Sequence, residues 1–258
     1  MTANGRPAVL ITGAAVRIGR EIALALAADG HPVAVHYNTS RGPAEATVAE
    51  LQALGVTAAA VQADLKDHDA VLELVPAAAG ALGQPVGVLI NNASLFENDR
   101  MTNATQQSFD DHVAINLRAP LFLAQQFAAA LPEDMQGSVI NLIDMRVRKP
   151  LPGFISYTVS KAGLEMLTKT MAMALAPRIR VNAIGPGPVL PNERQSDEQF
   201  WKQWRSTLLK RGANPDEIAA GVRFLLASPS VTGQMICMDG GQHLPWPPID
   251  AEAASLDG

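Results

Sequence analysis

Short runs of apolar, mostly β-branched residues alternate along this chain with longer segments that carry helical spacing. The runs are nearly continuous in apolar residues, which is typical of parallel strands covered by helices on both faces. The expected strands are 8–12, 32–36, 57–62, 86–91, 138–143, 178–184 and 234–238. The expected helices are 19–29, 44–54, 67–81, 107–131, 157–176 and 216–227. This order predicts an α/β fold with a parallel sheet of about seven strands joined by right-handed crossovers.

Residues 1–258 are expected to form one domain, because no repeat, low-complexity block or long polar linker interrupts the alternation. Two segments depart from it. Residues 188–213 are rich in proline and charge, and we expect them to form a substrate-binding loop or lid within the domain. Residues 243–258 form a proline-rich tail.

Charge and composition exclude several classes of protein. The net charge of −5 argues against a broadly basic surface that binds nucleic acid. Cys237 is the single cysteine, so no intrachain disulfide can form. His31, His68 and His112 lack metal-ligand spacing, and we expect no metal site. No apolar run approaches a membrane span and the polar N-terminus lacks the pattern of a signal peptide, so we expect a cytoplasmic protein with no membrane partner.

Residues 12–19 follow the first expected strand directly and open the first expected helix. A dinucleotide pyrophosphate binds at such a place, on the free amides of a helix N-terminus. Gly13 permits the tight turn and Gly19 allows the helix to approach the sheet, whereas Arg17 stands where a further glycine is usual. We expect Gly13, Arg17 and Ile18 to bind a cofactor. The alternative is an ordinary strand–helix turn.

The residues after the second expected strand favour a phosphorylated ribose. An NAD site usually has an acid here for the ribose 2′-hydroxyl, whereas this chain has no acid before Glu45. Hydroxyl, amide and guanidinium groups suit a 2′-phosphate and predict NADP(H). The expected contacts are Tyr37, Asn38, Thr39, Ser40 and Arg41. The alternative is an ordinary polar loop.

Polar residues also follow the third and fourth expected strands, where open parallel sheets bind ligands. Asp64 can accept a hydrogen bond from an exocyclic amine such as that of adenine. We expect Asp64, Leu65, Asn92, Ala93 and Ser94 to contact the cofactor. The alternatives are a helix cap at Asp64 and a simple turn at the asparagine pair.

Tyr157 and Lys161 lie four residues apart in an expected helix and therefore share one of its faces. An ammonium group near a phenol lowers the phenol pKa, which would make Tyr157 a usable proton donor. Asp144 lies 13 residues before Tyr157, just after the fifth expected strand, and Asn116 lies within the long helix before that strand. The alternative is a surface tyrosine beside a solvated lysine.

These motifs, in this order, resemble the short-chain dehydrogenase/reductase family over nearly the whole chain. The matching positions are 12–19, Asp64, 91–93, Asn116, Tyr157, Lys161, 186–187 and 239–241. The resemblance implies a doubly wound Rossmann fold, a nicotinamide cofactor that Pro186 and Gly187 also contact, and a homotetramer. It also implies that Asn116, Tyr157 and Lys161 are catalytic.

Two departures resemble one branch of that family, the pteridine reductases and the related bacterial dihydromonapterin reductases. Asp144 stands where most members have serine, and Arg17 where most have glycine. In that branch the residue matching Phe96 stacks on the pterin opposite the nicotinamide, and those matching Arg17 and Ser94 touch cofactor and substrate. Pro191, where many members have a threonine that touches the cofactor, is a further departure that this branch tolerates.

The chemistry of Asp144 is compatible with the branch. Carbonyl reduction builds negative charge on oxygen, which a carboxylate would repel, whereas a pterin C=N bond needs a proton on nitrogen. A protonated Asp144 could still serve a carbonyl, or the residue could only orient its loop. We expect NADPH-dependent reduction of a dihydropterin or dihydrofolate to the tetrahydro form, with Tyr157 as proton donor assisted by Lys161 and Asp144. The expected substrate-binding residues are Arg17, Ser94, Phe96, Asp144 and Tyr157. The alternatives are a carbonyl reductase, for example of 3-oxoacyl thioesters, and a non-catalytic nucleotide-sensing protein.

Overall fold

The computed structural model describes residues 5–191 and 196–244. Residues 192–195 of the expected substrate-binding loop and residues 245–258 of the expected tail lie outside the described residues. Within the described part, seven strands form one parallel sheet in the order β3-β2-β1-β4-β5-β6-β7. The strands are β1 (Ala8–Ile11), β2 (Val33–Tyr37), β3 (Ala58–Gln62), β4 (Val86–Asn91), β5 (Gly137–Leu142), β6 (Ile179–Pro186) and β7 (Met235–Met238).

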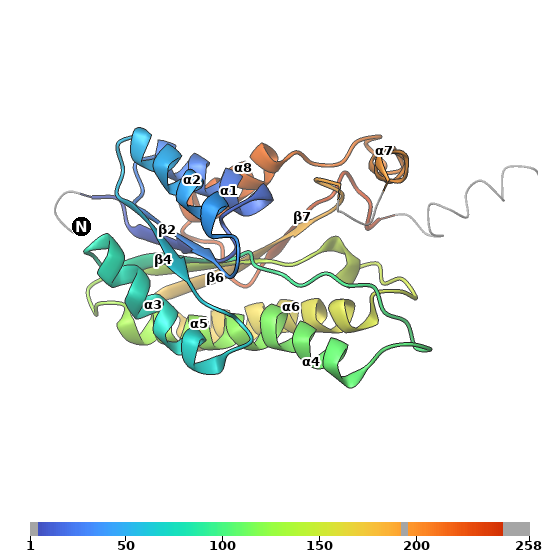
Figure 1. Cartoon of the computed structure of the whole chain (residues 1–258), viewed down its shortest axis with the longest axis horizontal. Coiled ribbons are helices and arrows are strands. Elements are labelled where there is room, and N and C mark those ends of the chain that lie inside the picture. The colour runs from blue at the N-terminus through green and yellow to red at the C-terminus, as the bar shows by residue number, and fades with distance from the viewer. Residues whose placement is uncertain (1–4, 192–195, 245–258) are drawn as a thin grey trace, which may run out of the picture.

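Helices cover both faces of this sheet. The helices are α1 (Arg17–Ala28), α2 (Arg41–Ala53), α3 (His68–Leu82), α4 (Gln106–Val113), α5 (Ala119–Ala130), α6 (Ile155–Leu175), α7 (Asp197–Arg205) and α8 (Pro215–Ala227). Figure 1 shows α1, α2 and α8 on one face and α3, α5 and α6 on the other. The three layers form the doubly wound Rossmann fold that the sequence predicted.

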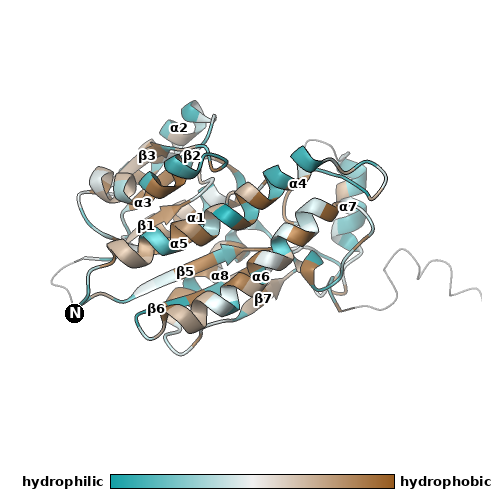
Figure 2. Cartoon of the chain, turned by 90° about the horizontal axis from the view of Figure 1, so that it is seen from below, coloured by the Kyte–Doolittle hydropathy of each residue, from teal (hydrophilic) through white to brown (hydrophobic). Residues whose placement is uncertain are grey.

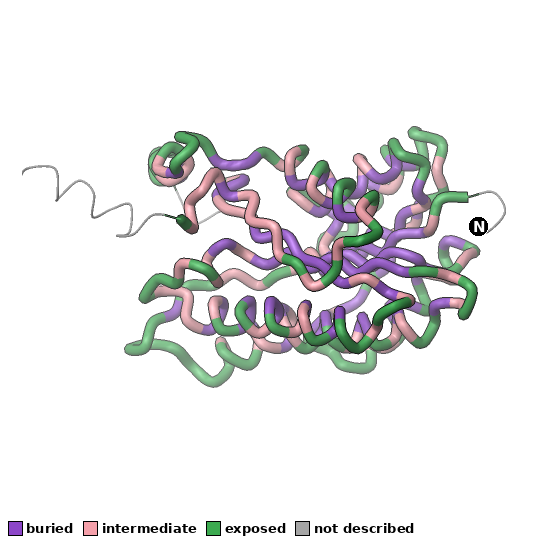
Figure 3. The backbone as a smooth tube through the Cα atoms, turned by 180° about the vertical axis from the view of Figure 1, so that it is seen from behind, coloured by how far each residue is buried: buried purple, intermediate pink, exposed green. Residues whose placement is uncertain are grey.

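The hydrophobic core lies on the two faces of the sheet, in one cluster under each helix layer. β1, β4 and β5 are buried at every residue, which explains why these strands read as continuous apolar runs rather than alternating ones. Figure 3 shows the buried backbone concentrated in the sheet and the exposed backbone in the outer turns. Figure 2 shows apolar and polar stretches alternating along α5 and α6, as expected for helices with one face on the sheet.

The sheet reverses its winding direction at β1, which lies between β2 and β4. The segments that leave the carboxyl ends of β1 and β4 therefore turn to opposite faces and leave a crevice between them, where open α/β sheets bind ligands. Thr12 joins the two segments, because its hydroxyl accepts hydrogen bonds from the amides of Asn92 and Ala93 at 2.9 and 3.0 Å.

Two helix boundaries differ from the expected ones. The single helix expected at 107–131 is divided into α4 and α5 by a π-helical turn, Ala114–Arg118. The residues there are ordinary helix formers, and a one-residue change in hydrogen-bond spacing leaves no mark on composition. The helix expected at 44–54 begins instead at Arg41. Pro43 is tolerated in its first turn, where a backbone N–H has no intrahelical partner.

Candidate functional site

A cleft of about 530 Å³ opens at the carboxyl ends of strands β1 to β6 and is closed on one side by α6. Most of the predicted site residues line it. These are Gly13, Arg17, Ile18, Asn38, Asp64, Leu65, Asn92, Ala93, Ser94, Phe96, Asp144, Tyr157, Lys161, Pro186 and Gly187. The cleft therefore joins segments that are far apart in the sequence and that were singled out separately.

Five predicted residues do not line the cleft. Tyr37, Thr39, Ser40 and Arg41 flank Asn38, which does line it. The Arg41 side chain is exposed and its Nε donates a hydrogen bond to Glu45 at 2.8 Å. The fifth residue is Asn116, which is completely buried.

The first turn of the cleft has no room for side chains. Gly13 has a φ of 64°, and a Cβ there would lie 3.0 Å from the Cα of Ala93. A Cβ at Gly19 would lie 2.4 Å from the Gly13 carbonyl oxygen and 2.5 Å from the Asn92 side-chain nitrogen. Both positions therefore require glycine. The N-terminus of α1 lines the cleft, and the first amides of a helix, which have no partner within it, can bind a pyrophosphate.

His36 fixes this turn from beneath, and the sequence analysis did not assign it a role. Its Nδ1 accepts a hydrogen bond from the Gly13 amide at 3.0 Å. The proton must then be on Nε2, which donates to the Ala63 carbonyl at 3.0 Å. Burial lowers the pKa of His36 to about 4, although the Ala63 carbonyl and Asp64 act in the opposite direction. The ring is therefore neutral at physiological pH.

Arg17 adopts a left-handed backbone conformation with a φ of 57°, which explains why glycine is usual at this position. Its guanidinium group donates hydrogen bonds to the carbonyl oxygens of Pro191 and Leu190, at 2.8 and 3.4 Å. The side chain thus links the first turn to the segment that follows β6, across the mouth of the cleft.

Tyr157, which is buried, and Asp144, which is partly buried, form a hydrogen-bonded pair in the lining of the cleft. The Tyr157 hydroxyl donates to Asp144 Oδ2 at 2.9 Å, and Asp144 Oδ1 accepts from the Arg146 amide at 2.8 Å. Burial raises the pKa of Asp144 above its ordinary value. Burial and the adjacent Asp144 raise the pKa of Tyr157 well above 10.

The phenol pKa is therefore raised, whereas the spacing of Tyr157 and Lys161 led us to expect a lowered value. Lys161 Nζ lies 5.9 Å from the centre of the Tyr157 ring and donates to the Leu142 carbonyl at 2.8 Å. Asp144 accepts a hydrogen bond from the phenol hydroxyl, and its negative charge raises the phenol pKa. Burial lowers the pKa of Lys161 to about 8, so its ammonium form is lost in mildly alkaline solution.

Asn116 lies in the π turn and uses all of its amide hydrogen-bonding capacity inside the protein. Its Nδ2 donates to the Leu95 carbonyl and to Ser160 Oγ, at 2.9 and 3.0 Å. Its Oδ1 accepts from the Leu95 amide and from Ser94 Oγ, at 2.8 and 3.2 Å. Asn116 therefore holds the segment after β4 against α6.

Phe96 forms an aromatic wall of the cleft next to Tyr157. Its ring is stacked on Phe154 with centroids 4.5 Å apart, and it meets the edge of the Tyr157 ring at 4.7 Å. The guanidinium carbon of Arg146 lies 4.7 Å from the Phe154 centroid. A flat ligand beside Phe96 would thus lie next to both the phenol and a π surface.

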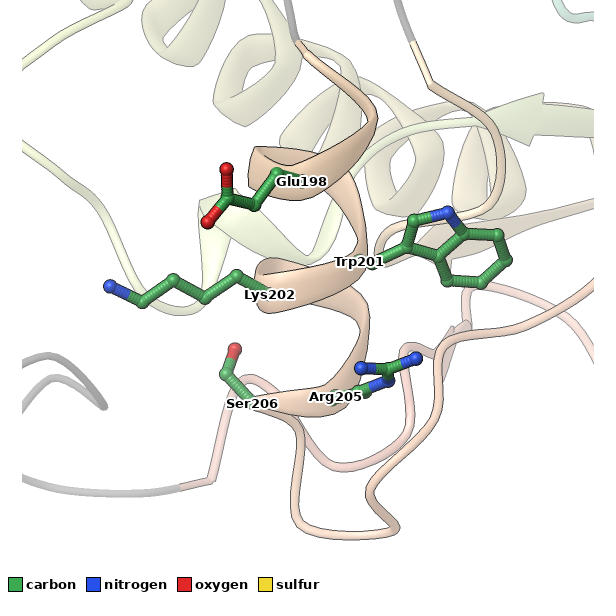
Figure 4. Close-up of a pocket in the computed structure, with 5 residues that line it drawn as sticks. All are labelled: Glu198, Trp201, Lys202, Arg205 and Ser206. Atoms are coloured by element: carbon green, nitrogen blue, oxygen red, sulfur yellow. The ribbon is translucent and has the colours of Figure 1, made fainter.

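A second hollow, of about 580 Å³, lies on α7 and shares no lining residue with the cleft. Figure 4 shows Trp201 and Arg205 on one side of the helix and Glu198, Lys202 and Ser206 on the other. It contains none of the residues predicted to act in chemistry.

Among residues 5–191 and 196–244, no helix has both the length and the apolar character needed to cross a membrane. In the same part of the chain, no group of three or more histidine, cysteine or acidic side chains is placed to hold a metal ion.

Comparison with known proteins identifies relatives of two kinds. The sequence pattern of the short chain dehydrogenase family matches residues 7–201. A 3-oxoacyl-[acyl-carrier-protein] reductase, FabG, of Staphylococcus epidermidis is 35% identical over 240 residues, which is 91% of this chain and 98% of the relative. The crystal structure of FolM Alternative dihydrofolate reductase 1 from Brucella canis, complexed with NADP, has a TM-score of 0.91 and 46% identity, covering 94% of this chain and 96% of that one. The Brucella suis protein of the same name, also with NADP, has a TM-score of 0.92 and 46% identity, covering 97% and 99%.

Proposed function

The chain belongs to the short-chain dehydrogenase family, and from that premise we propose that it is an NADPH-dependent reductase of pteridines. The substrate would be a dihydropterin or dihydrofolate, reduced to its tetrahydro form. The observation that carries the proposal is the Asp144–Tyr157 pair, in which a partly buried carboxyl group stands 2.9 Å from the phenol oxygen. The similarity to two proteins named as alternative dihydrofolate reductases supports it.

The residues of the cleft fit NADP(H). The turn between Gly13 and Gly19, which is so tightly packed that a Cβ at either glycine would collide with neighbouring protein atoms, would hold the pyrophosphate on backbone amides. Asn38 and its neighbours would meet the ribose 2′-phosphate, and Asp64 the adenine amine. Lys161 would meet the nicotinamide ribose. When bound, NADPH supplies the hydride.

Phe96 and Asp144 would select the substrate. A pteridine is a flat heterocycle, so stacking on Phe96 adds about 0.5–1.5 kcal/mol to what burial alone provides. Its edge carries hydrogen-bond donors and acceptors, which Ser94 and Asp144 in the lining of the cleft would meet. A small ketone gains little from such a wall.

Reduction of a C=N bond needs a hydride on carbon and a proton on nitrogen. Tyr157 is neutral at physiological pH, because burial and Asp144 raise its pKa, and so it carries the proton to be given. A phenol with so high a pKa is a weak acid while Asp144 is ionised. Burial raises the pKa of Asp144, and a protonated Asp144 would donate to the phenolate rather than repel it.

Asp144 would therefore pass its proton towards the phenol and recover one from solvent after each turnover. Lys161 would stabilise the transient phenolate while its ammonium group persists, that is, below a pH of about 8. Asn116 would act through Ser94 and Leu95, whose positions it fixes.

The test is the rate of NADPH oxidation, followed by absorbance, with 7,8-dihydrobiopterin, dihydrofolate and a 3-oxoacyl thioester. We expect turnover of the pteridines by the wild-type protein. Asp144→Ser should slow pterin reduction and should raise activity on a reactive ketone, because a neutral hydroxyl donates to a developing oxyanion. No pteridine turnover together with rapid reduction of the thioester would overturn the proposal.

The second candidate function is reduction of 3-oxoacyl thioesters. The 35% identity with a 3-oxoacyl-[acyl-carrier-protein] reductase favours it. A protonated Asp144 could donate to the carbonyl oxygen in place of a serine hydroxyl. Calorimetry of a diaminopteridine antifolate with the protein–NADPH complex distinguishes the two candidate functions. A pteridine reductase should bind the antifolate, whereas a reductase of 3-oxoacyl thioesters should not.

A further inference from the structure

Asp99 is a buried acid in the segment between β4 and α4, and it does not line the cleft. Its side chain is 4% exposed and accepts three hydrogen bonds. Oδ1 accepts from the Ser156 amide at 3.1 Å. Oδ2 accepts from Ser108 Oγ at 3.2 Å and from Ser156 Oγ. Two of the three donors belong to the first turn of α6.

Helix α6 has no cap of its own. Phe154 occupies the capping position with a φ of 60° and makes no side-chain capping bond. Asp99 supplies the cap from a segment that lies 57 residues earlier, by accepting from the Ser156 amide with its carboxylate. Its backbone carbonyl accepts from the Phe154 amide at 2.8 Å. A negative group is also favoured at a helix N-terminus by the helix dipole.

The left-handed backbone conformation of Phe154 has to be held in place by neighbouring residues. A bulky residue avoids positive φ unless its surroundings hold it there, and strained residues gather at functional sites. Phe154 is held by the Asp99 carbonyl and by its stacking on Phe96. The result is that Phe154 supports one face of the Phe96 ring.

The segment that carries Phe96 is anchored at three successive points. Leu95 is bound to Asn116 through its amide and its carbonyl. The Glu97 amide donates to Nε2 of His112, which is completely buried. Asp99 forms the third anchor, and it bonds directly to the helix that carries Tyr157, whereas Leu95 is joined to that helix only through Asn116. Although burial acts to raise it, hydrogen bonds from Ser156 and Ser108 lower the pKa of Asp99, so the group is a carboxylate at neutral pH.

We propose that Asp99 is a positioning residue for the reduction, which holds the proton donor Tyr157 and the ring wall Phe96 in one fixed arrangement. Ser156 is the link, since it is bonded to Asp99 and directly precedes Tyr157. The inference rests on the proposed role of Tyr157 as proton donor and not on which substrate the cleft accepts.

The test compares three variants of the full-length protein. Asp99→Asn removes the charge and an acceptor, and Ser156→Ala removes only the hydroxyl that joins α6 to Asp99. Ser108→Ala is the matched control, because it removes a hydroxyl from the same carboxylate oxygen but on α4. We measure kcat and KM with 7,8-dihydrobiopterin, the Kd for NADPH by fluorescence, and the melting temperature.

We expect Asp99→Asn and Ser156→Ala to lower kcat at least about tenfold, since a small misplacement of a reacting group can cost up to about a hundredfold. KM for the pteridine should rise and the Kd for NADPH should stay within about twofold, because Asp99 does not line the cleft to which Gly13 and Gly19 belong. Ser108→Ala should behave as wild type in both kinetic constants.

Wild-type kcat and KM in Ser156→Ala would overturn the inference, and so would an equal loss in Ser108→Ala. A parallel loss of NADPH affinity would assign Asp99 to general stability instead. If the Asp99→Asn variant fails to fold, the kcat and KM of Ser156→Ala alone test the inference. If the wild type reduces the 3-oxoacyl thioester and no pteridine, the proposed substrate is wrong, and the same variants are compared with the thioester.

Discussion

Acid should destabilise this protein through His36 in particular. The ring is 2% exposed and makes hydrogen bonds at both nitrogens. Its pKa is about 4 in the folded protein and 6.5 is the ordinary value, so between these values the unfolded chain binds a proton that the folded chain does not. The stability that His36 contributes is therefore complete above pH 6.5 and falls as the pH falls towards 4.

The size of the effect follows from the two pKa values. Each unit of difference corresponds to about 1.4 kcal/mol, so the free energy of unfolding should fall by about 3 kcal/mol between the ordinary and the folded pKa. The His36→Asn variant provides the comparison. Its amide oxygen can still accept from Gly13 but its side chain is too short to reach Ala63, and it does not titrate in this range.

The assay is urea unfolding followed by circular dichroism at several pH values from 4 to 8. Wild type should be the more stable at neutral pH, and its advantage over His36→Asn should shrink steadily as the pH is lowered through the interval. A difference between the two proteins that does not change with pH would refute the reasoning. It would mean that the pKa of His36 does not differ between the folded and the unfolded protein.

Three further predictions concern the cleft. Tyr157→Phe should lower kcat about 10²–10⁴-fold while the melting temperature and NADPH affinity persist; near-normal turnover would assign the proton to Asp144 or water. Phe96→Ala should weaken a diaminopteridine in calorimetric titration of the NADPH complex by about tenfold, with NADPH affinity itself unchanged; equal losses for both ligands would contradict the stacking role. Replacement of Ser40 and Arg41 by alanine should reduce the preference for NADPH over NADH by about tenfold in kcat/KM, since charge-assisted hydrogen bonds to the phosphate are lost; an unchanged ratio would place the phosphate elsewhere.

The parts of the fold that depend on short stretches of sequence could be predicted from the sequence. The apolar runs identified all seven strands of the described sheet, because burial on both faces leaves a continuous signal. The glycines at 13 and 19 and the pair Tyr157 and Lys161 could each be recognised in the sequence, since each depends on a short segment with one geometry, and the structure places all four in one cleft. The π turn escaped prediction because it differs from an α-helix only in which carbonyl each amide meets.

The missed features of the site depend on contacts between distant segments. His36 acts on Gly13 from another strand, and Asp99 acts on α6 across 57 residues, so neither produces a pattern in the chain. The raised pKa of Tyr157 was missed for the same reason. The lysine on its own helix could be placed by spacing, whereas the 2.9 Å contact with Asp144 could not. The single domain, the homotetramer and the cytoplasmic location stay predictions.

The π turn at Ala114–Arg118 restricts where this chain can change length. Each residue of a helix turns the chain by about 100°, so the loss of one residue from the turn would rotate α4 against α5 by about that angle. Asn116 would then leave either Leu95 or Ser160 and the two segments would separate. Residues 100–105 are exposed throughout and lie just before α4. Natural insertions and deletions in this part of the protein should therefore accumulate at 100–105 and be absent from the five residues of the turn.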